Sequence, residues 1–175
     1  MNAALADEFV PDVRHPAGVD DPLFGVVRRG SVHGMWAVRG PGIGLAQLTG
    51  GSRVVTSGGD GTLSRSGGRL RRRAQDRHVD LAGQRYTLHQ TSPRRAQLRR
   101  DGVPICWLRS VRIASRARFG RSLPSYRIVA WAEPADPTAA AIAHLLASRY
   151  GVGALAALPI YAAAPGPSRS VTSSR

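Results

Sequence analysis

The chain has no lysine, a single cysteine and no long apolar run. All 25 basic residues are arginine, which together with abundant Ala and Gly is typical of a GC-rich genome. Cys106 is the only cysteine, so an intrachain disulfide is excluded, and its place in the apolar run 103–108 predicts a buried side chain. No stretch reaches the ~18 apolar residues of a membrane-spanning helix, and residues 1–13 lack the basic region of a secretory signal. We therefore expect a cytoplasmic protein that is at most peripheral at a membrane.

The net charge of +14 is concentrated in the middle of the chain. Residues 65–127 carry 17 arginines against three aspartates, whereas residues 1–30 carry five acidic residues and three arginines. Such a basic body favours an anionic partner, and three classes qualify: nucleic acid, an acidic membrane surface or an acidic protein. The alternative is that the arginines only face water, because charge by itself does not specify a partner.

Length and composition predict one small β-rich domain. A chain of 175 residues can enclose one hydrophobic core, and its 20 glycines and 12 prolines are typical of a turn-rich β protein. Residues 1–21 are predicted to form a loosely ordered acidic leader, residues 22–160 the domain, and residues 161–175 a disordered tail. Two questions stay open at this point: whether residues 22–77 complete the same sheet as the rest, and the oligomeric state.

Short apolar segments separated by turn residues predict antiparallel strands. The segments lie at residues 23–28, 32–38, 43–48, 53–56, 79–81, 86–88, 96–98, 103–107, 110–118 and 126–131. Apolar and polar residues alternate in the later segments, and Asp101-Gly102 is a typical two-residue hairpin turn. The Gly- and Ser-rich stretch 49–68 contains only one strand-like segment, at 53–56.

Alternation also predicts which side chains share a face. Val103, Ile105 and Trp107 are expected on one face of their strand. In the segment 126–131, Ile128 and Ala130 are expected on one face, and Val129 and Trp131 on the other. Both of these faces are apolar, so this strand is expected in the centre of the sheet.

One helix is predicted over residues 137–150. Asp136 can cap its first turn, Pro137 suits the first helical position, and Gly151 suits a left-handed residue after the last turn. Nearly all residues between them are Ala, Ile or Leu, and a helix that is apolar around most of its circumference must be buried. Only strands are available to enclose it. The predicted fold class is therefore mainly β with one buried C-terminal helix (α+β), an antiparallel meander closing into a barrel around the helix.

Three segments within about residues 78–155 resemble the tubby C-terminal-like superfamily: GQRYTLHQ, AQLRRDGVPICWLR and SYRIVAWAEPADPTAAAIAHLLASRYG. That group holds the tubby domains, the LURP-one-related proteins and the phospholipid scramblases. The resemblance implies a closed antiparallel barrel around an apolar helix in a group that is mostly not enzymatic. For tubby domains it further implies binding of phosphoinositide headgroups through basic residues. No headgroup-binding motif matches here residue by residue, so the resemblance assigns no site. The lipidated cysteines and terminal membrane segment of scramblases are not seen in this sequence.

The stretch Gly58-Gly59-Asp60-Gly61-Thr62 matches the phosphate-loop signature of the diacylglycerol and NAD kinases. In those enzymes the signature follows a buried strand and opens a helix. Here it is followed by residues 63–68, which include two adjacent glycines that each cost roughly 1 kcal/mol in a helix interior. We interpret the stretch as a Gly-rich hairpin loop that does not hold nucleotide. A kinase-like nucleotide binder is kept as a remote alternative.

No set of residues indicates a catalytic, metal or cofactor site. The five histidines are scattered and have no metal-ligand spacing around Cys106. We interpret His144 and Ser148, four residues apart, as a hydrogen-bonded pair inside the buried helix. The three tryptophans lie in strand patterns and are expected in the core rather than on a base-stacking surface. We expect no enzymatic activity and no cofactor, and keep a small enzyme as a remote alternative.

Clusters of arginine are the best candidate for a functional site. The candidate anion-binding residues are Arg71, Arg72, Arg73, Arg85, Arg94, Arg95, Arg99, Arg100, Arg112 and Arg116. Because every second strand residue shares a face, Arg85, Arg99 and Arg112 are expected on one outer surface. We predict a non-catalytic basic module that binds anionic phospholipid headgroups at a membrane surface. The alternative is a nucleic-acid-binding protein without sequence specificity, and a protein partner stays open. A shallow, one-sided arginine patch would favour the membrane, and a long groove would favour nucleic acid.

Overall fold

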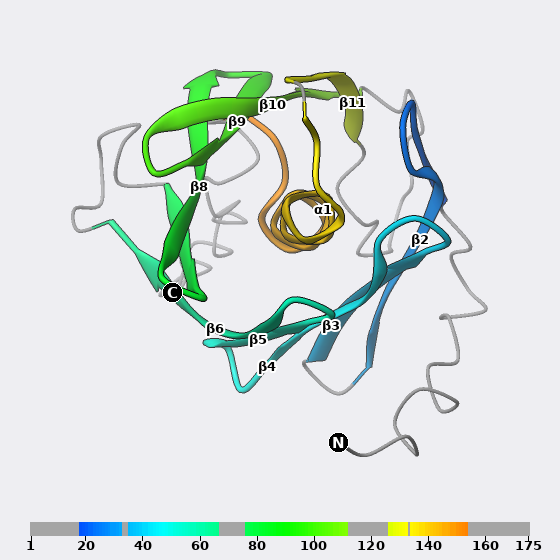
Figure 1. Cartoon of the computed structure of the whole chain (residues 1–175). Coiled ribbons are helices and arrows are strands. Elements are labelled where there is room, and N and C mark those ends of the chain that lie inside the picture. The colour runs from blue at the N-terminus through cyan, green and yellow to red at the C-terminus, as the bar shows by residue number, and fades with distance from the viewer. Residues whose placement is uncertain (1–17, 33–34, 67–75, 112–125, 133, 154–175) are drawn as a thin grey trace, which may run out of the picture.

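The computed structural model is an antiparallel meander that closes almost completely into a barrel around one helix (Figure 1). It describes residues 18–32, 35–66, 76–111, 126–132 and 134–153. The elements are β1 (Val19–Asp21), β2 (Gly25–Val32), β3 (Met35–Gly40), β4 (Gly44–Thr49), β5 (Arg53–Thr56), β6 (Gly59–Arg65), β7 (Arg77–Leu81), β8 (Gln84–Ser92), β9 (Arg95–Arg100), β10 (Val103–Ser110), β11 (Tyr126–Trp131) and α1 (Pro137–Tyr150). Each strand pairs with the next along the chain in one 11-stranded sheet. The predicted fold class is confirmed, and the N-terminal half contributes strands to the same sheet.

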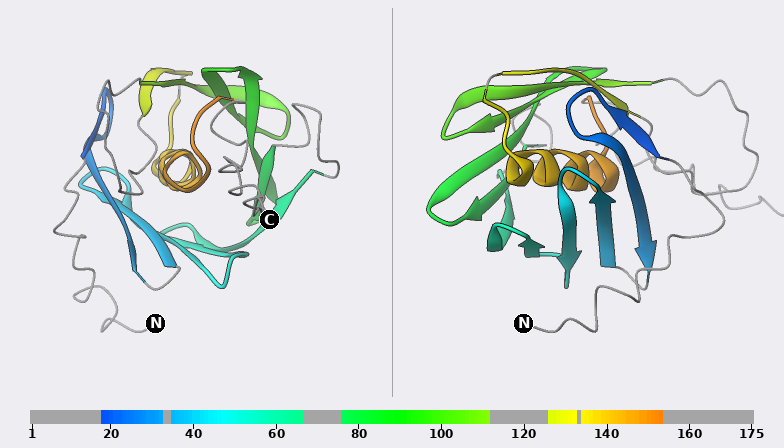
Figure 2. Two further views of the ribbon diagram at one scale, coloured as in Figure 1. Left: turned by 180° about the vertical axis from the view of Figure 1, so that it is seen from behind. Right: turned by 45° about the vertical axis from the view of Figure 1, so that its right-hand side comes forward.

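The helix α1 fills the interior of the barrel, as both views in Figure 2 show. Its ends are those predicted. The Asp136 Oδ1 atom accepts the N–H of Ala139 at 2.7 Å, and Gly151 ends the helix with φ of 76° while its N–H donates to the Ala147 carbonyl. Residues 139–148 are all buried, as expected for a helix apolar around its circumference. In the described part of the chain, no helix combines the length and apolar character needed to cross a membrane.

The barrel is closed at a seam between β1 and β11, the first and last strands of the hydrogen-bonded order. The expectation that β11 is central is therefore wrong, because among the described strands β11 pairs only with β10. Side chains close the seam instead of backbone hydrogen bonds. The Trp131 Nε1 atom donates to both carboxylate oxygens of Asp21 at 3.1 Å, and the rings of Phe24 and Trp131 meet edge to face at 5.7 Å.

A β-bulge in β11 explains which side chains reach the seam. Leu108 pairs with Ile128 but Trp107 pairs with Ala130, so Val129 is the extra residue. The bulge turns Trp131 toward the interior, on the side of Ile128, and leaves Val129 54% exposed. The predicted sharing of a face by Ile128 and Ala130 is wrong for this reason.

A second bulge, in β10, shows that the predicted sharing of one face by Val103, Ile105 and Trp107 is also wrong. Pro104 pairs with Arg99 and Cys106 pairs with Leu98, which leaves Ile105 as the extra residue. Proline cannot donate to a strand ladder and is accommodated at bulges. Beyond it, Cys106 and Leu108 point inward, whereas Val103 is 62% exposed. Cys106 is fully buried, as predicted, and burial raises the pKa of its thiol.

Two stretches are more ordered than the sequence indicated. Val19–Asp21 was assigned to a loosely ordered leader, but it forms β1, and the Asp21 side chain is fully buried. The strand β6 was not predicted, because its glycines and serines lack an apolar alternation. The remaining leader at 1–17, most of the predicted segment 110–118 and the tail at 161–175 lie outside the described residues.

The kinase-like glycine stretch forms the β5–β6 hairpin. Thr56 pairs with Gly59 across the turn, and a strand follows rather than the helix that the kinases have. Tight packing accounts for two of the glycines. A Cβ atom on Gly58 would lie 2.6 Å from Thr138 Oγ1, and one on Gly61 would lie 2.7 Å from the Asp80 carbonyl oxygen. The hairpin interpretation is confirmed, and the absence of nucleotide binding stays a prediction.

Candidate anion-binding site

The two ends of the barrel differ in charge. Among the described residues, every acidic side chain except Asp76 belongs to the end where α1 begins, which we call the acidic end: Asp20, Asp21, Asp60, Asp80, Asp101 and Asp136. The opposite end, where α1 finishes, we call the basic end, and its described residues include Arg65, Arg77, Arg94, Arg95, Arg109, Arg127 and Arg149. Asp76 also lies at the basic end, but it is buried and hydrogen-bonded to His89 and to the Gln90 N–H.

At and near the acidic end, predicted anion-binding arginines are engaged with partners inside the protein. Arg85 pairs with Asp80 at 2.6 Å, and this hydrogen bond holds the pKa of the Asp80 carboxyl below its ordinary value. Arg100 pairs with Asp136 at 2.9 Å, beside the first turn of α1. The Arg99 Nη2 atom donates to Gln97 Oε1 at 3.2 Å. We leave these three arginines out of the candidate site.

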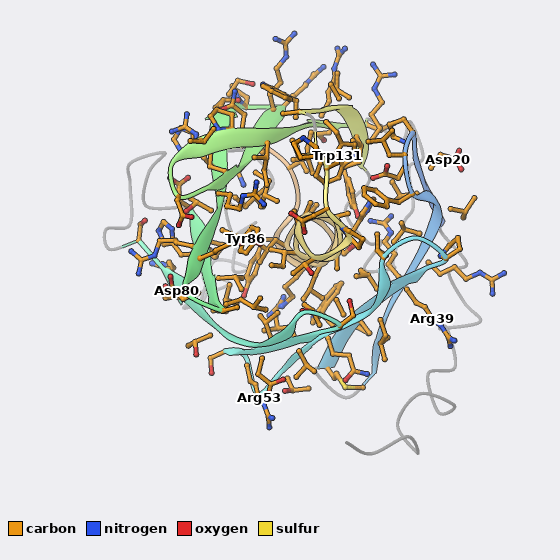
Figure 3. All side chains as sticks on the ribbon, viewed as in Figure 1. Asp20, Arg39, Arg53, Asp80, Tyr86 and Trp131 are labelled. Carbon is orange, nitrogen blue, oxygen red and sulfur yellow. The ribbon has the colours of Figure 1, made fainter. Side chains whose placement is uncertain are left out.

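Three arginines at the basic end stand directly opposite one another on adjacent strands. Arg95 of β9 pairs with Arg109 of β10, which pairs in turn with Arg127 of β11. All three are exposed, and the structure shows no ion pair between this row and any described acidic residue. Nitrogen-tipped side chains project outward above these strands in Figure 3. Like charges at directly opposed strand positions are destabilising, so the fold itself gains nothing from this row.

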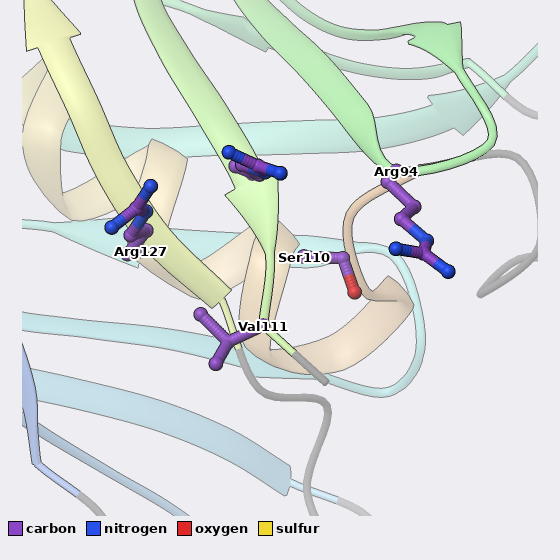
Figure 4. A pocket seen from close by; sticks show the side chains of 5 residues that line it. Arg94, Ser110, Val111 and Arg127 are labelled. Carbon is purple, nitrogen blue, oxygen red and sulfur yellow. The ribbon is translucent and has the colours of Figure 1, made fainter. Parts of the chain in front are cut away.

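An open depression lies next to the arginine row. It has a volume of about 300 Å³ and is lined by Arg94, Arg109, Ser110, Val111 and Arg127 (Figure 4). Arg94 and Arg95 were predicted from the sequence, whereas Arg109 and Arg127 were missed. An unbroken Asp101-Gly102 hairpin would place Arg95 opposite Leu108. The bulge after Pro104 shifts the pairing by one residue and brings Arg95 opposite Arg109.

Buried structure supports the turn that carries Arg94. The chain leaving α1 passes close beneath this turn, and the Gly153 N–H donates to the buried Gln90 Oε1 at 2.7 Å. A Cβ atom on Gly153 would collide with the Pro93 carbonyl oxygen, and its φ of 93° also requires glycine. The position of Arg94 is therefore set by packing against the exit of the helix.

Aromatic rings lie among the other arginines of the basic end. The Arg149 guanidinium stands 5.3 Å from the Trp36 ring and 5.4 Å from the Tyr150 ring, and that of Arg77 stands 4.7 Å from Tyr150. Burial lowers the pKa of the Arg77 guanidinium, which nevertheless stays positively charged at neutral pH. The expected core location holds for Trp36 and Trp131, which pack on the core, while Trp107 is half-buried opposite Gln97 on the outer face.

A carboxylate, an imidazole and two hydroxyls meet inside the barrel but are sealed from solvent. The His144 Nε2 atom lies 2.9 Å from Asp21 Oδ2, and its Nδ1 atom lies 2.9 Å from the Tyr126 hydroxyl. The Tyr126 hydroxyl also lies 3.2 Å from Ser148 Oγ. His144 and Ser148, which were predicted to bond to each other, therefore both contact Tyr126 instead. Burial raises the pKa of Tyr126. All four residues are at most 4% exposed, so this buried network links the helix to the barrel wall.

Half of the predicted arginines lie outside the described residues. Arg71, Arg72 and Arg73 belong to the segment 67–75, and Arg112 and Arg116 belong to the segment 112–125. The described residues that flank the two segments are Ser66 and Asp76, and Val111 and Tyr126. All four of these flanking residues belong to the basic end.

Comparisons with protein-family models, curated proteins and solved structures found no match for this chain. Among the described residues, no group of three potential metal ligands occurs.

Proposed function

We propose that the basic end is a binding module for anionic phospholipid headgroups at a membrane surface. The observation that carries the proposal is the exposed row Arg95, Arg109 and Arg127, which has no acidic partner among the described residues. Repulsion within the row costs stability in the free protein, and an anionic ligand lying across the three strands would offset it. Adjacent strands are about 4.8 Å apart, so one phosphate can contact two neighbouring guanidiniums.

The shape of the site favours a membrane over nucleic acid. The depression is open and lies at one end of the barrel, so a flat surface can reach it. Exposed apolar side chains accompany the arginines: Val111 is 41% exposed in the depression and Val129 is 54% exposed on β11. Basic and apolar groups side by side suit the boundary between headgroups and acyl chains. Each arginine near an acidic membrane contributes about 1 kcal/mol.

Co-sedimentation of nuclease-treated protein with liposomes tests the proposal. The protein is expected to pellet with phosphatidylserine-containing vesicles and not with phosphatidylcholine vesicles, and to do so at physiological salt. Replacing Arg95, Arg109 or Arg127 by glutamate is expected to weaken pelleting by roughly tenfold, because each replacement reverses a charge at the surface. Arg28→Glu makes the same charge change on an exposed position of β2, opposite Arg39, and is the matched control.

Two results would overturn the membrane proposal. Equal losses in Arg28→Glu and Arg109→Glu would show that net charge, and not the basic end, governs the interaction. Salt-dependent binding to single-stranded DNA or RNA by a protein that ignores acidic vesicles would assign the same arginines to nucleic-acid phosphates instead.

A further inference from the structure

Ser110 is a hydroxyl-bearing residue at the arginine-lined depression. It is the last residue of β10 and lines the depression together with Arg94, Arg109 and Arg127 (Figure 4). Its backbone N–H donates to the Arg94 carbonyl at 2.9 Å, which holds the strand end against the Arg94 turn. Within the described residues, no side chain or backbone group is hydrogen-bonded to the Ser110 hydroxyl.

We propose that Ser110 is a phosphorylation site whose phosphate occupies the depression and switches off headgroup binding. The inference rests on the proposed function, because the switch acts on the same arginines. The phosphoryl donor is a nucleoside triphosphate held by a separate protein kinase. Ser110 Oγ attacks the γ-phosphorus, the bond to the bridging oxygen of the β-phosphate breaks, and a nucleoside diphosphate leaves. The hydroxyl proton passes to the general base of the kinase.

The charges around Ser110 would hold a phosphate in place. A phosphoserine carries about −1.5 to −2 charges and three strong acceptor oxygens. Guanidinium groups bind phosphate through paired, charge-assisted hydrogen bonds, and three of them line the depression. No acidic side chain is among the residues that line it. The phosphate would neutralise about two of the positive charges and take the place of a lipid phosphate.

Other described serines near the basic end lack this arrangement. The Ser66 hydroxyl lies 2.6 Å from His78 Nε2, and Ser92 Oγ accepts the Arg94 N–H at 3.3 Å. Neither lines the depression. Ser57, in the exposed turn of the β5–β6 hairpin, belongs to the acidic end and provides a matched control position.

The first test measures the phosphate itself, without lipid. The full-length chain is made with phosphoserine incorporated at position 110 or, as the control, at position 57, and each is titrated by ³¹P NMR. Arginines that bind the phosphate favour its dianion, so the second pKa of the phosphate at 110 is expected below the ordinary ~6. Arg94→Ala is expected to move it back toward that value. A phosphate at 110 that titrates like the one at 57 overturns the proposal.

The second test measures the switch. Unmodified protein is expected to bind phosphatidylserine vesicles, and phosphoserine at 110 to weaken this binding by roughly tenfold or more. Phosphoserine at 57 is expected to have a much smaller effect. Equal binding by the two phosphorylated forms overturns the switch. A lowered phosphate pKa in a protein that never binds vesicles overturns the proposed function, and the switch with it, while showing that the depression is a phosphate site.

Discussion

The Asp21 carboxylate accepts the indole N–H of Trp131, which lies 110 residues later in the chain. The same carboxylate lies 2.9 Å from His144 Nε2 and accepts the backbone N–H groups of Leu23 and Phe24. One buried side chain therefore joins the first strand, the last strand and the helix. A barrel whose first and last strands share no backbone ladder depends on such a contact to stay closed.

Replacing Trp131 by phenylalanine tests this dependence. The variant keeps most of the ring contacts but removes the donor to a buried, charged acceptor, and hydrogen bonds to charged groups contribute about 1.5–3 kcal/mol. We expect the free energy of unfolding, measured by urea denaturation, to fall by about that amount. Trp107→Phe is the control, since Trp107 is half-buried on the outer face and its Nε1 atom has no described acceptor. Similar losses in both variants would contradict a special role for the seam.

The pH dependence of stability provides a second test of Asp21. Burial acts to raise the pKa of this carboxyl, but hydrogen bonds from His144, Leu23 and Phe24 outweigh it, and the pKa lies below its ordinary value of 3.8. A carboxyl whose pKa is depressed in the folded state stabilises the protein above its unfolded pKa, and this contribution is lost as pH falls through the folded pKa. We expect unfolding to become easier below about pH 4.

Asp21→Asn should change the stability of the protein both at neutral pH and in acid. The variant is expected to be less stable than the parent at pH 7, where the charged acceptor is lost, and to lose less stability between pH 4 and pH 2. Thermal melts at a series of pH values measure how the melting temperature of the parent and of the variant changes with pH. Parallel curves for parent and variant would show that Asp21 does not contribute to acid sensitivity.

The sequence predicted the helix and the antiparallel meander around it well, because helix ends and strand alternation are local signals. Asp136, Pro137 and Gly151 mark the helix ends through the chemistry of their own side chains and backbones. The wrong face assignments have one physical cause, which is that the bulges at Ile105 and Val129 shift strand register by one residue. A one-residue shift exchanges the two faces of a strand, so alternation alone assigned them wrongly.

The same shift explains why half of the candidate site was missed. Arg94 and Arg95 are adjacent in sequence and were recognised as a cluster. Arg109 and Arg127 join them only through strand pairing, and Arg109 reaches its place opposite Arg95 because of the bulge after Pro104. Arg85 and Arg100 were included because they are arginines, although aspartates of other segments pair with them. A sequence shows neither the register nor such partners.

The packing of the glycine hairpin on the helix can be tested by a pair of substitutions. Gly58→Ala would place a Cβ atom 2.6 Å from Thr138 Oγ1, so we expect a loss of about 1–3 kcal/mol in the free energy of unfolding. Thr138→Ala removes the colliding atoms and is expected to restore most of this loss in the double variant. A double-mutant cycle by chemical denaturation measures the coupling. Additive effects would show that Gly58 is needed for its backbone and not for space beside the helix.

The arginine row predicts that stability and binding change in opposite directions in one variant. Arg109 stands between Arg95 and Arg127, so Arg109→Thr removes both like-charge contacts and introduces a residue that suits strands. We expect the free energy of unfolding to rise by about 0.2–1 kcal/mol at low salt, and the gain to shrink at 1 M NaCl, where exposed charges are screened. The same variant is expected to bind phosphatidylserine vesicles more weakly, because it loses the central contact of the row. Arg28→Thr, on β2 beside Arg39, is the control: it removes one like-charge contact instead of two, so its stability gain is expected to be smaller, and vesicle binding is expected to be unchanged. If Arg109→Thr were less stable than the parent, the row would be part of the fold's own stabilisation, and the main argument for an anionic ligand at the basic end would fail.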